Sequence, residues 1–324
     1  MPKKRNGTKY RRREFLRKLA ASGALATSSE GFPAEAKGTK SSRAQEMSGL
    51  NASRATHPIN YPRVFTGSHL QAIAFPLGGI GTGTISLGGR GQLRDWEIFN
   101  RPDKGKSPNY AFAAVWAQAE GKQPLARVLE SRIDPPYVGN SGLGANNVPG
   151  LPRLDSTTFV GAYPFARIDF QDSKLPLSII LEAFNPLVPL DVEASGLPVA
   201  ILRYKLTNSQ SVPVKVGLAF SLDNPVGKEG RQAAFRQGEG AAGLYMDNPF
   251  LPSQDPLKGS FVLGVLGDTA GRISYLRGWK GTKWWDGPLT FWDDFTDDGR
   301  TEILFEHAME KLFLPLFADR PHDD

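Results

Sequence analysis

The clearest pattern in this sequence is the alternation of apolar and polar residues in two neighbouring segments, 200–207 and 214–222. The apolar positions are Ala200, Leu202, Tyr204 and Leu206, and then Val214, Val216, Leu218, Phe220 and Leu222. A period of two is typical of a strand with one face on a core. The link at 208–213, NSQSVP, has the composition of a turn. We therefore predict an antiparallel β-hairpin over residues 200–222.

Similar patterns predict further strands along most of the chain. The predicted strands are 111–119, 126–130, 165–170, 177–184, 261–266 and 272–276. The turn sequence at 268–271, DTAG, predicts that the last two also form a hairpin. No long helical period separates the strands, which argues against alternating β and α units.

Many short strands joined by turns rich in Gly and Pro predict an all-β fold, a large antiparallel β-sandwich of two extended sheets with long loops. One such loop is 134–153, which has no periodic pattern, and loops of that length are often functional. We see no internal repeat and no segment long and apolar enough to span a bilayer.

A glycine-rich stretch at 75–102, FPLGGIGTGTISLGGRGQLRDWEIFNRP, resembles nucleotide-binding loops only superficially. A dinucleotide fingerprint started at Gly79 has Thr84 where its third glycine should be. A phosphate loop over 78–83 lacks the lysine that should follow it. The spacing therefore disfavours nucleotide binding, and the glycines are better explained by tight turns that present residues 94–101 at a surface.

The positive net charge of +6 comes from the first 54 residues of the chain. Residues 1–54 hold 13 Lys and Arg against 4 Asp and Glu, whereas the remainder holds 26 against 29. The body therefore lacks the clustered positive charge that nucleic-acid binding needs. The chain has no cysteine, which excludes thiolate chemistry.

Residues 1–54 have the features of an export signal followed by a flexible, disordered linker. Arg12, Arg13, Phe15 and Leu16 match the twin-arginine pattern R-R-x-F-L-K, in which arginine replaces the last lysine. A short apolar stretch follows at 19–26. We expect export by the twin-arginine route to the periplasm or exterior of a bacterium. A disordered basic tail or a nuclear signal is the alternative.

Two groups of residues could contribute to a carbohydrate site. Asp95 and Glu97 flank Trp96, and on a strand they would share one face. Asp286 follows Trp284 and Trp285 in a segment dense in aromatic residues. Glycosidases use paired carboxylates, although such aromatic density is also typical of a core or a domain interface. The four histidines have no metal-ligand spacing, so we expect neither a metal nor a cofactor.

Several of these motifs resemble the N-terminal domain of glycoside hydrolase family 116, which includes non-lysosomal glucosylceramidases and bacterial β-glucosidases. The resemblance is carried by FPLGGIGTG at 75–83, GGRG at 88–91, LRDWEIFNRP at 93–102, GAYPFA at 161–166, EAFNP at 182–186 and YKLTN at 204–208. It extends over roughly residues 60–300 and implies a two-domain retaining β-glycosidase. The family's catalytic glutamate and aspartate lie in a second domain, an (α/α) toroid, so no residue of this chain inherits a catalytic role.

The resemblance implies a non-catalytic domain that supports the missing toroid. We predict a leader at 1–54, a β-sandwich at 55–300 and an atypical tail at 301–324. Its residues 301–314 could form a short helix, or the tail could be read out of frame in a truncated gene. Rim or interface candidates are Arg94, Asp95, Trp96, Glu97, Trp284, Trp285 and Asp286. The alternative is a stand-alone structural module or one that binds a carbohydrate or glycolipid.

Overall fold

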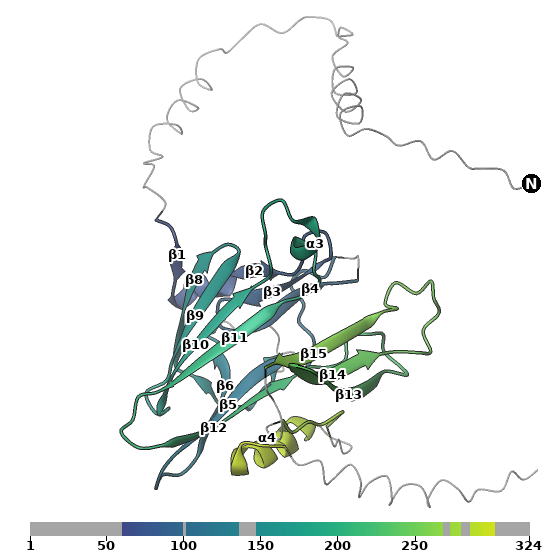
Figure 1. Ribbon diagram of the computed structural model, residues 1–324. Helices are drawn as coiled ribbons and strands as arrows, with labels where there is room; N and C mark the ends of the chain where they lie inside the picture. Colours follow the sequence, from purple (N-terminus) through teal and green to yellow (C-terminus); the bar gives the residue numbers. More distant parts are fainter. Residues whose placement is uncertain (1–59, 100–101, 136–146, 268–272, 280–285, 302–324) are drawn as a thin grey trace, which may run out of the picture. The chain divides into compact units, whose positions relative to one another are not determined.

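The computed structural model describes residues 60–99, 102–135, 147–267, 273–279 and 286–301 (Figure 1). The chain divides into two units, 1–58 and 59–324, and every described residue belongs to the second. Arg12, Arg13, Phe15 and Leu16 of the predicted export signal therefore lie outside the described residues.

Strands dominate the described residues, which confirms the predicted all-β fold class. The elements are β1 (Arg63–Phe65), η1 (Gly67–Ala72), β2 (Ala74–Leu77), β3 (Thr84–Gly88), β4 (Leu93–Glu97), β5 (Phe112–Ala119), β6 (Leu125–Ser131), β7 (Arg153–Leu154), β8 (Ser156–Ala162), β9 (Phe165–Gln171), β10 (Leu177–Phe184), α3 (Val192–Ser195), β11 (Ile201–Asn208), β12 (Val214–Ser221), β13 (Gln232–Gly238), β14 (Ala241–Asp247), β15 (Ser260–Leu266) and α4 (Gly287–Asp298).

The two larger sheets form a sandwich around one core. One sheet has the order β1-β8-β9-β10-β11 and the other β12-β5-β6-β7. Alternate residues of β10, Leu177, Ile179, Leu181 and Ala183, are buried in the same apolar cluster as Val115 of β5. Two smaller sheets, β2-β3-β4 and β13-β14-β15, complete the unit. Leu77 and Leu87 of the first of these also reach the main core.

The hairpin predicted over 200–222 is wrong, although both of its strands are present. β11 pairs with β10 in one sheet, and β12 pairs with β5 in the other. The segment at 209–213 therefore connects the two sheets instead of closing a ladder. Tyr204 of β11 and Phe220 of β12 nevertheless pack against the same core, and this explains why both strands alternate alike.

The aromatic-rich segment that follows Asp286 forms a helix, α4, which the sequence pattern did not predict. The rings of Phe291, Trp292 and Phe295 in α4 are buried against Phe112 and Trp116 of β5. The indole Nε1 of Trp116 donates a hydrogen bond to the carbonyl of Thr296 at 2.9 Å. β5 is consequently buried on both faces, which accounts for its nearly continuous apolar sequence. The helix predicted over 301–314 lies outside the described residues except for Thr301.

The strand predicted at 272–276 does not form over its described residues, 273–276. Its expected partner β15 pairs instead with β14. Tyr275 packs by its ring on Phe235 of β13, with the two ring centroids 4.2 Å apart. Tyr275 therefore contacts this sheet through its ring on β13, and the predicted hairpin with β15 is wrong over the described residues.

Candidate functional site

The glycine-rich turn at 78–83 joins β2 to β3 and packs directly on the backbone of another loop. That loop, residues 186–199, contains α3 and is called the α3 loop below. The amide of Ile80 donates to the carbonyl of Ser195 at 2.8 Å. A Cβ at Gly79 would lie only 2.3 Å from the carbonyl oxygen of Leu197. Glycine is required here because two backbones meet, and no bound ligand is needed to explain it.

The second glycine motif, 88–91, fastens the β3–β4 turn to the sandwich. The amide of Ser131 donates to the carbonyl of Arg90 at 2.9 Å, and Thr157 Oγ1 donates to the carbonyl of Gly89 at 3.1 Å. The Arg90 guanidinium lies 3.4 Å from Glu130 Oε2. Both glycine motifs thus have structural roles in holding separate segments together.

Glu130 is buried between two arginines. Its Oε2 lies 3.4 Å from Arg90 Nη1 and 3.4 Å from Arg153 Nε. Burial lowers the pKa of Arg90, and the nearby Glu130 carboxylate opposes that shift. Arg153 also donates to the carbonyls of Asn147 and Val148, so it fastens the described end of the long loop 134–153. Residues 136–146 of that loop lie outside the described residues.

The candidates Arg94 to Glu97 lie on β4, but they do not form an exposed carboxylate pair. The register of β3 and β4 shifts between Thr84 and Ser86, so β4 has one extra residue there. Asp95 takes a positive φ of 51° and is buried, with only 2% of its surface exposed. This bulge breaks the simple alternation that would have placed Asp95 and Glu97 on one face.

Both carboxylates hold the segment that follows β4. Asp95 Oδ1 accepts a hydrogen bond from the amide of Gly105 at 2.6 Å, and its own amide donates to the carbonyl of Lys106 at 2.7 Å. Glu97 pairs with Lys104 at 2.6 Å, and this hydrogen bond raises the pKa of Lys104. Their contacts give the two carboxylates a structural role.

Replacing Asp95 tests that structural role. Asp95→Ala should lower the free energy of unfolding by about 2–3 kcal/mol, because it removes a buried acceptor and leaves alanine at a positive φ. Asp95→Asn should cost about 1 kcal/mol or less, because asparagine still accepts a hydrogen bond and tolerates that backbone. Urea unfolding measures both. Equal losses in the two variants would show that the charge, rather than the Gly105 contact, matters.

Trp96 also faces the inside of the unit, and Arg94 beside it is partly exposed. Trp96 is 6% exposed, and its ring centroid lies 5.6 Å from that of Phe261 on β15. It therefore links two of the sheets, and the expectation that residues 94–101 are presented at a surface is wrong for Asp95 and Trp96. Arg94 Nε lies 3.6 Å from Asp95 Oδ2, and its Nη1 donates to the carbonyl of Gln71 at 3.4 Å.

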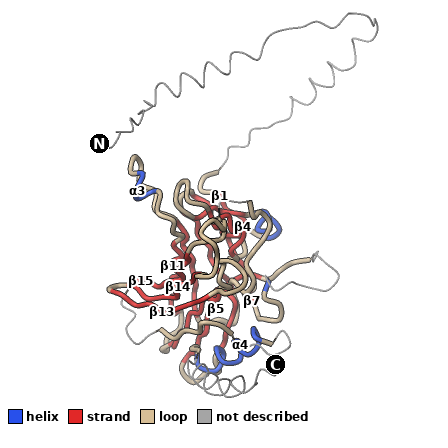
Figure 2. The backbone as a smooth tube through the Cα atoms, turned by 90° about the vertical axis from the view of Figure 1, so that its right-hand side faces the viewer, coloured by secondary structure: helices blue, strands red, loops and turns tan. Residues whose placement is uncertain are grey.

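The second group of candidates lies elsewhere in the unit. Asp286 immediately precedes α4, and its carbonyl accepts from the amide of Thr290 at 2.8 Å. Trp284 and Trp285 lie outside the described residues. Figures 1 and 2 show α4 well apart from β4, so Asp286, which precedes α4, does not join residues 94–97 in one site.

A feature that sequence reasoning missed is the apolar surface of the α3 loop. Figure 2 shows α3 at the tip of a loop that stands away from the strands. Its exposed apolar side chains are Val188, Leu190, Val192, Leu197 and Val199, and Ile80 of the glycine-rich turn is exposed as well. The sequence PLVPLDVEASGLPV, apolar but without strand alternation, was the available signal.

One hollow of the described residues is formed by residues 107–109 and 223–231, and most of the residues that line it are polar. Its lining includes Asn109, Asp223, Asn224, Lys228 and Arg231. Arg231 pairs with Asp223 at 2.9 Å, and the Asn224 amide donates to the carbonyl of Gln232 at 2.9 Å. These groups are largely engaged with the protein itself, and no aromatic residue is among those that line the hollow. It therefore offers no stacking platform for a sugar ring.

The described part of the chain contains no group of three or more His, Asp or Glu side chains arranged to hold a metal ion. Nor does it contain a helix with the length and hydropathy needed to cross a membrane.

The comparison with protein families agrees with this architecture. Residues 74–311 match the family model described as beta-glucosidase 2, glycosyl-hydrolase family 116 N-term. The match begins at β2 and includes the glycine-rich turn, the α3 loop and α4, and it extends beyond residue 300, where the predicted sandwich boundary lay. By this match, the chain belongs to the N-terminal domains of glycoside hydrolase family 116.

Proposed function

We propose that this chain is a non-catalytic domain that supports the (α/α) catalytic domain of a β-glucosidase or glucosylceramidase-like enzyme. The observation that carries the proposal is the family match over residues 74–311, which covers nearly all the described strands. Among the described candidates, Asp95 and Glu97 contact other residues of the domain, and Asp286 precedes α4, which lies apart from β4. This arrangement gives no support to an acid/base pair among the candidate residues that the structure describes.

We further propose that the chain acts outside the cytoplasm after export by the twin-arginine route. The support is the sequence of residues 12–17, RREFLR, followed by a weakly apolar stretch. This route carries folded proteins, and a sandwich whose sheets pair strands far apart in sequence is suited to folding before export.

The proposal predicts that the purified chain does not hydrolyse an aryl β-glucoside. The expected rate equals that of buffer, because a retaining glycosidase needs two carboxyl groups about 5–5.5 Å apart on either side of the scissile bond. Release of nitrophenol, followed by absorbance, measures this rate. Hydrolysis that disappears when one of the chain's own carboxylates is replaced would contradict the proposal.

Calorimetric titration with oligosaccharides distinguishes the proposed supporting domain from the alternative, a carbohydrate-binding module. The proposal predicts no measurable heat of binding for the chain alone. Saturable binding that is lost in Trp285→Ala would favour the module instead, since aromatic faces provide the stacking surface for sugars.

A further inference from the structure

Six exposed apolar residues on the α3 loop and the glycine-rich turn form a surface that we call the apolar knob: Ile80, Val188, Leu190, Val192, Leu197 and Val199. Leu190 is fully exposed, at 104% of its reference area, and Val192 is 84% exposed. Single exposed apolar residues are ordinary on protein surfaces. Here six of them lie on one short loop and on the turn bonded to it, and exposed apolar surface of this kind is common at interaction sites.

The loop that carries the knob is held in place from several sides. Asp191 Oδ1 caps α3 by accepting from the amide of Ala194 at 2.9 Å. Ser195 Oγ bridges the amide and the carbonyl of Val188, both at 3.0 Å. The glycine-rich turn adds the bond from the Ile80 amide to the Ser195 carbonyl. The knob is therefore a fixed surface, and binding would lose little conformational entropy.

The backbone at Leu190 points to a function for this exposure. Leu190 has a φ of +71°, a conformation that costs a leucine about 1–3 kcal/mol and is found mainly where surrounding structure imposes it. The strained backbone does not serve to bury the Leu190 side chain, because that side chain is fully exposed. Strain that presents an apolar side chain to solvent is expected where a partner covers that side chain.

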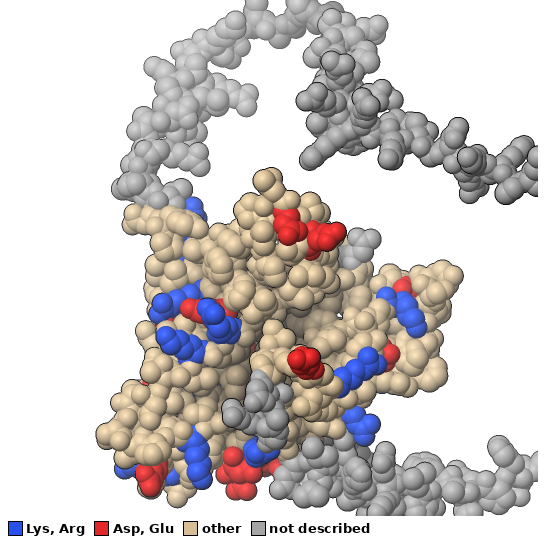
Figure 3. All heavy atoms as spheres, in the orientation of Figure 1, with Lys and Arg blue, Asp and Glu red and all other residues tan. Residues whose placement is uncertain are grey.

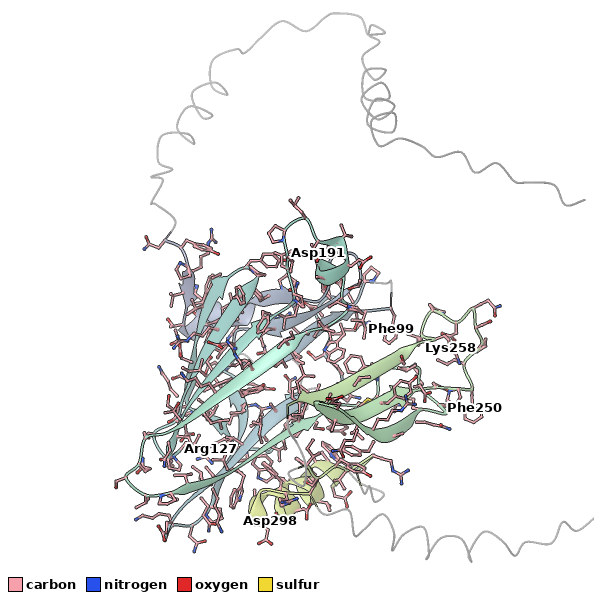
Figure 4. All side chains as sticks on the ribbon, viewed as in Figure 1. Phe99, Arg127, Asp191, Phe250, Lys258 and Asp298 are labelled. Atoms are coloured by element: carbon pink, nitrogen blue, oxygen red, sulfur yellow. The ribbon has the colours of Figure 1, made fainter. Side chains whose placement is uncertain are left out.

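The charges on the α3 loop narrow the choice of partner. Asp191 and Glu193 are its ionisable residues, and it contains no lysine or arginine. Figure 3 shows these acidic atoms over α3 without Lys or Arg atoms beside them on the visible face of the described residues, and Figure 4 labels Asp191 there. A second copy would bring like charges together, and an anionic lipid surface would repel them. The knob instead suits a protein surface that combines an apolar recess with a basic residue.

We propose that the apolar knob is the surface by which this domain docks on the catalytic domain, entering an apolar recess bordered by lysine or arginine. The inference rests on the proposed function, since the family assignment supplies the identity of the partner. The glycine-rich turn at 78–83 and the α3 loop lie within the matched residues, and the first supports the second. The glycine motif thus acts on docking indirectly, by positioning the knob.

The test uses the full 324-residue chain and a separately purified catalytic domain of a family 116 β-glucosidase. Sedimentation velocity should show a complex with the native chain. Leu190→Ser combined with Val192→Ser should weaken it about tenfold or more, because two exposed aliphatic side chains no longer contribute. Glu193→Arg should also weaken it by placing like charge opposite the basic border. Unchanged melting temperatures would show that the variants fold.

Phe250→Ser is the matched control. Phe250 is 75% exposed on the loop between β14 and β15, and Figure 4 places it far from Asp191. This variant should bind as the native chain does. If the native chain binds and the knob variants bind equally well, only the docking inference is wrong. If the native chain does not bind at all, the proposed supporting function is contradicted as well.

Two other results would overturn the inference in favour of another occupant. One is sedimentation of the native chain, but not of the double variant, with phosphatidylcholine vesicles containing glucosylceramide, which would assign the knob to a lipid surface. The other is self-association of the native chain that the double variant abolishes, which would assign the knob to a second copy.

Discussion

Glu130→Gln should lower the free energy of unfolding by about 3–5 kcal/mol, the largest effect we expect from one substitution in this domain. The Glu130 carboxylate lies between Arg90 and Arg153, and its side chain is only 5% exposed. Glutamine keeps the shape but leaves two buried guanidinium groups without their shared counter-charge. Because domain stabilities are about 5–15 kcal/mol, the loss should be plain in a urea unfolding curve.

The control for this variant is Glu239→Gln, at an exposed glutamate in the β13–β14 turn. Its effect should stay within about 0.5 kcal/mol, as is usual at the surface. The rate of proteolysis distinguishes loss of the Glu130 charge from a general loss of stability. Arg153 fastens residues 147–148, so the 147–153 segment should become more susceptible to proteolysis in the variant. A loss below about 1 kcal/mol, with unchanged proteolysis, would show that the three charges do not form a unit.

The sequence predicted individual strands better than their partners. β10 was placed at 177–184 because its alternation is long and regular, and the structure has it there. Alternation also identified β11 and β12, but the pattern reports only that one face meets a core. Which strand lies alongside depends on contacts across the whole sandwich, so the predicted pairing of β11 with β12 was wrong.

The helix α4 was missed because its aromatic residues have two explanations. Phe291 and Phe295 are four positions apart, which places them on one face of a helix. The same density of aromatic residues is also typical of a core or a domain interface, so their number alone did not predict a helix. Its helical state depends on the Phe112 and Trp116 surface that it covers, which lies far away in sequence.

The candidate site was the hardest part to predict. Sequence placed Asp95 and Glu97 on one face of a strand, but the bulge and the positive φ at Asp95 follow from the register of β3 against β4. The exposed apolar surface of the α3 loop was not predicted, because the exposure of Leu190 cannot be read from its identity. Apolar residues are buried on average, so its identity alone predicts that Leu190 is buried. Leu190 is an exception to that rule, and only the structure shows its exposure.

Gly79→Ala should destabilise the domain by about 1–3 kcal/mol and weaken docking of a catalytic domain as a secondary effect. The new Cβ would lie 2.3 Å from the carbonyl oxygen of Leu197 and 2.7 Å from the carbonyl carbon of Gly196. These are backbone atoms, so the glycine-rich turn and the α3 loop must move apart to admit a methyl group. That movement would also lengthen the bond from the Ile80 amide to the Ser195 carbonyl.

Gly81→Ala in the same turn is the matched control, because a Cβ there meets nothing within 4 Å. Gly81 has a φ of +80°, so its replacement reports backbone strain alone, about 1 kcal/mol. Urea unfolding compares the two stabilities, and sedimentation with the catalytic domain compares binding. We expect Gly79→Ala to reduce affinity at temperatures where both variants remain folded, and Gly81→Ala to leave it near the native value. Equal affinity in the two variants would mean that the contact between the glycine-rich turn and the α3 loop stabilises the fold without positioning the knob.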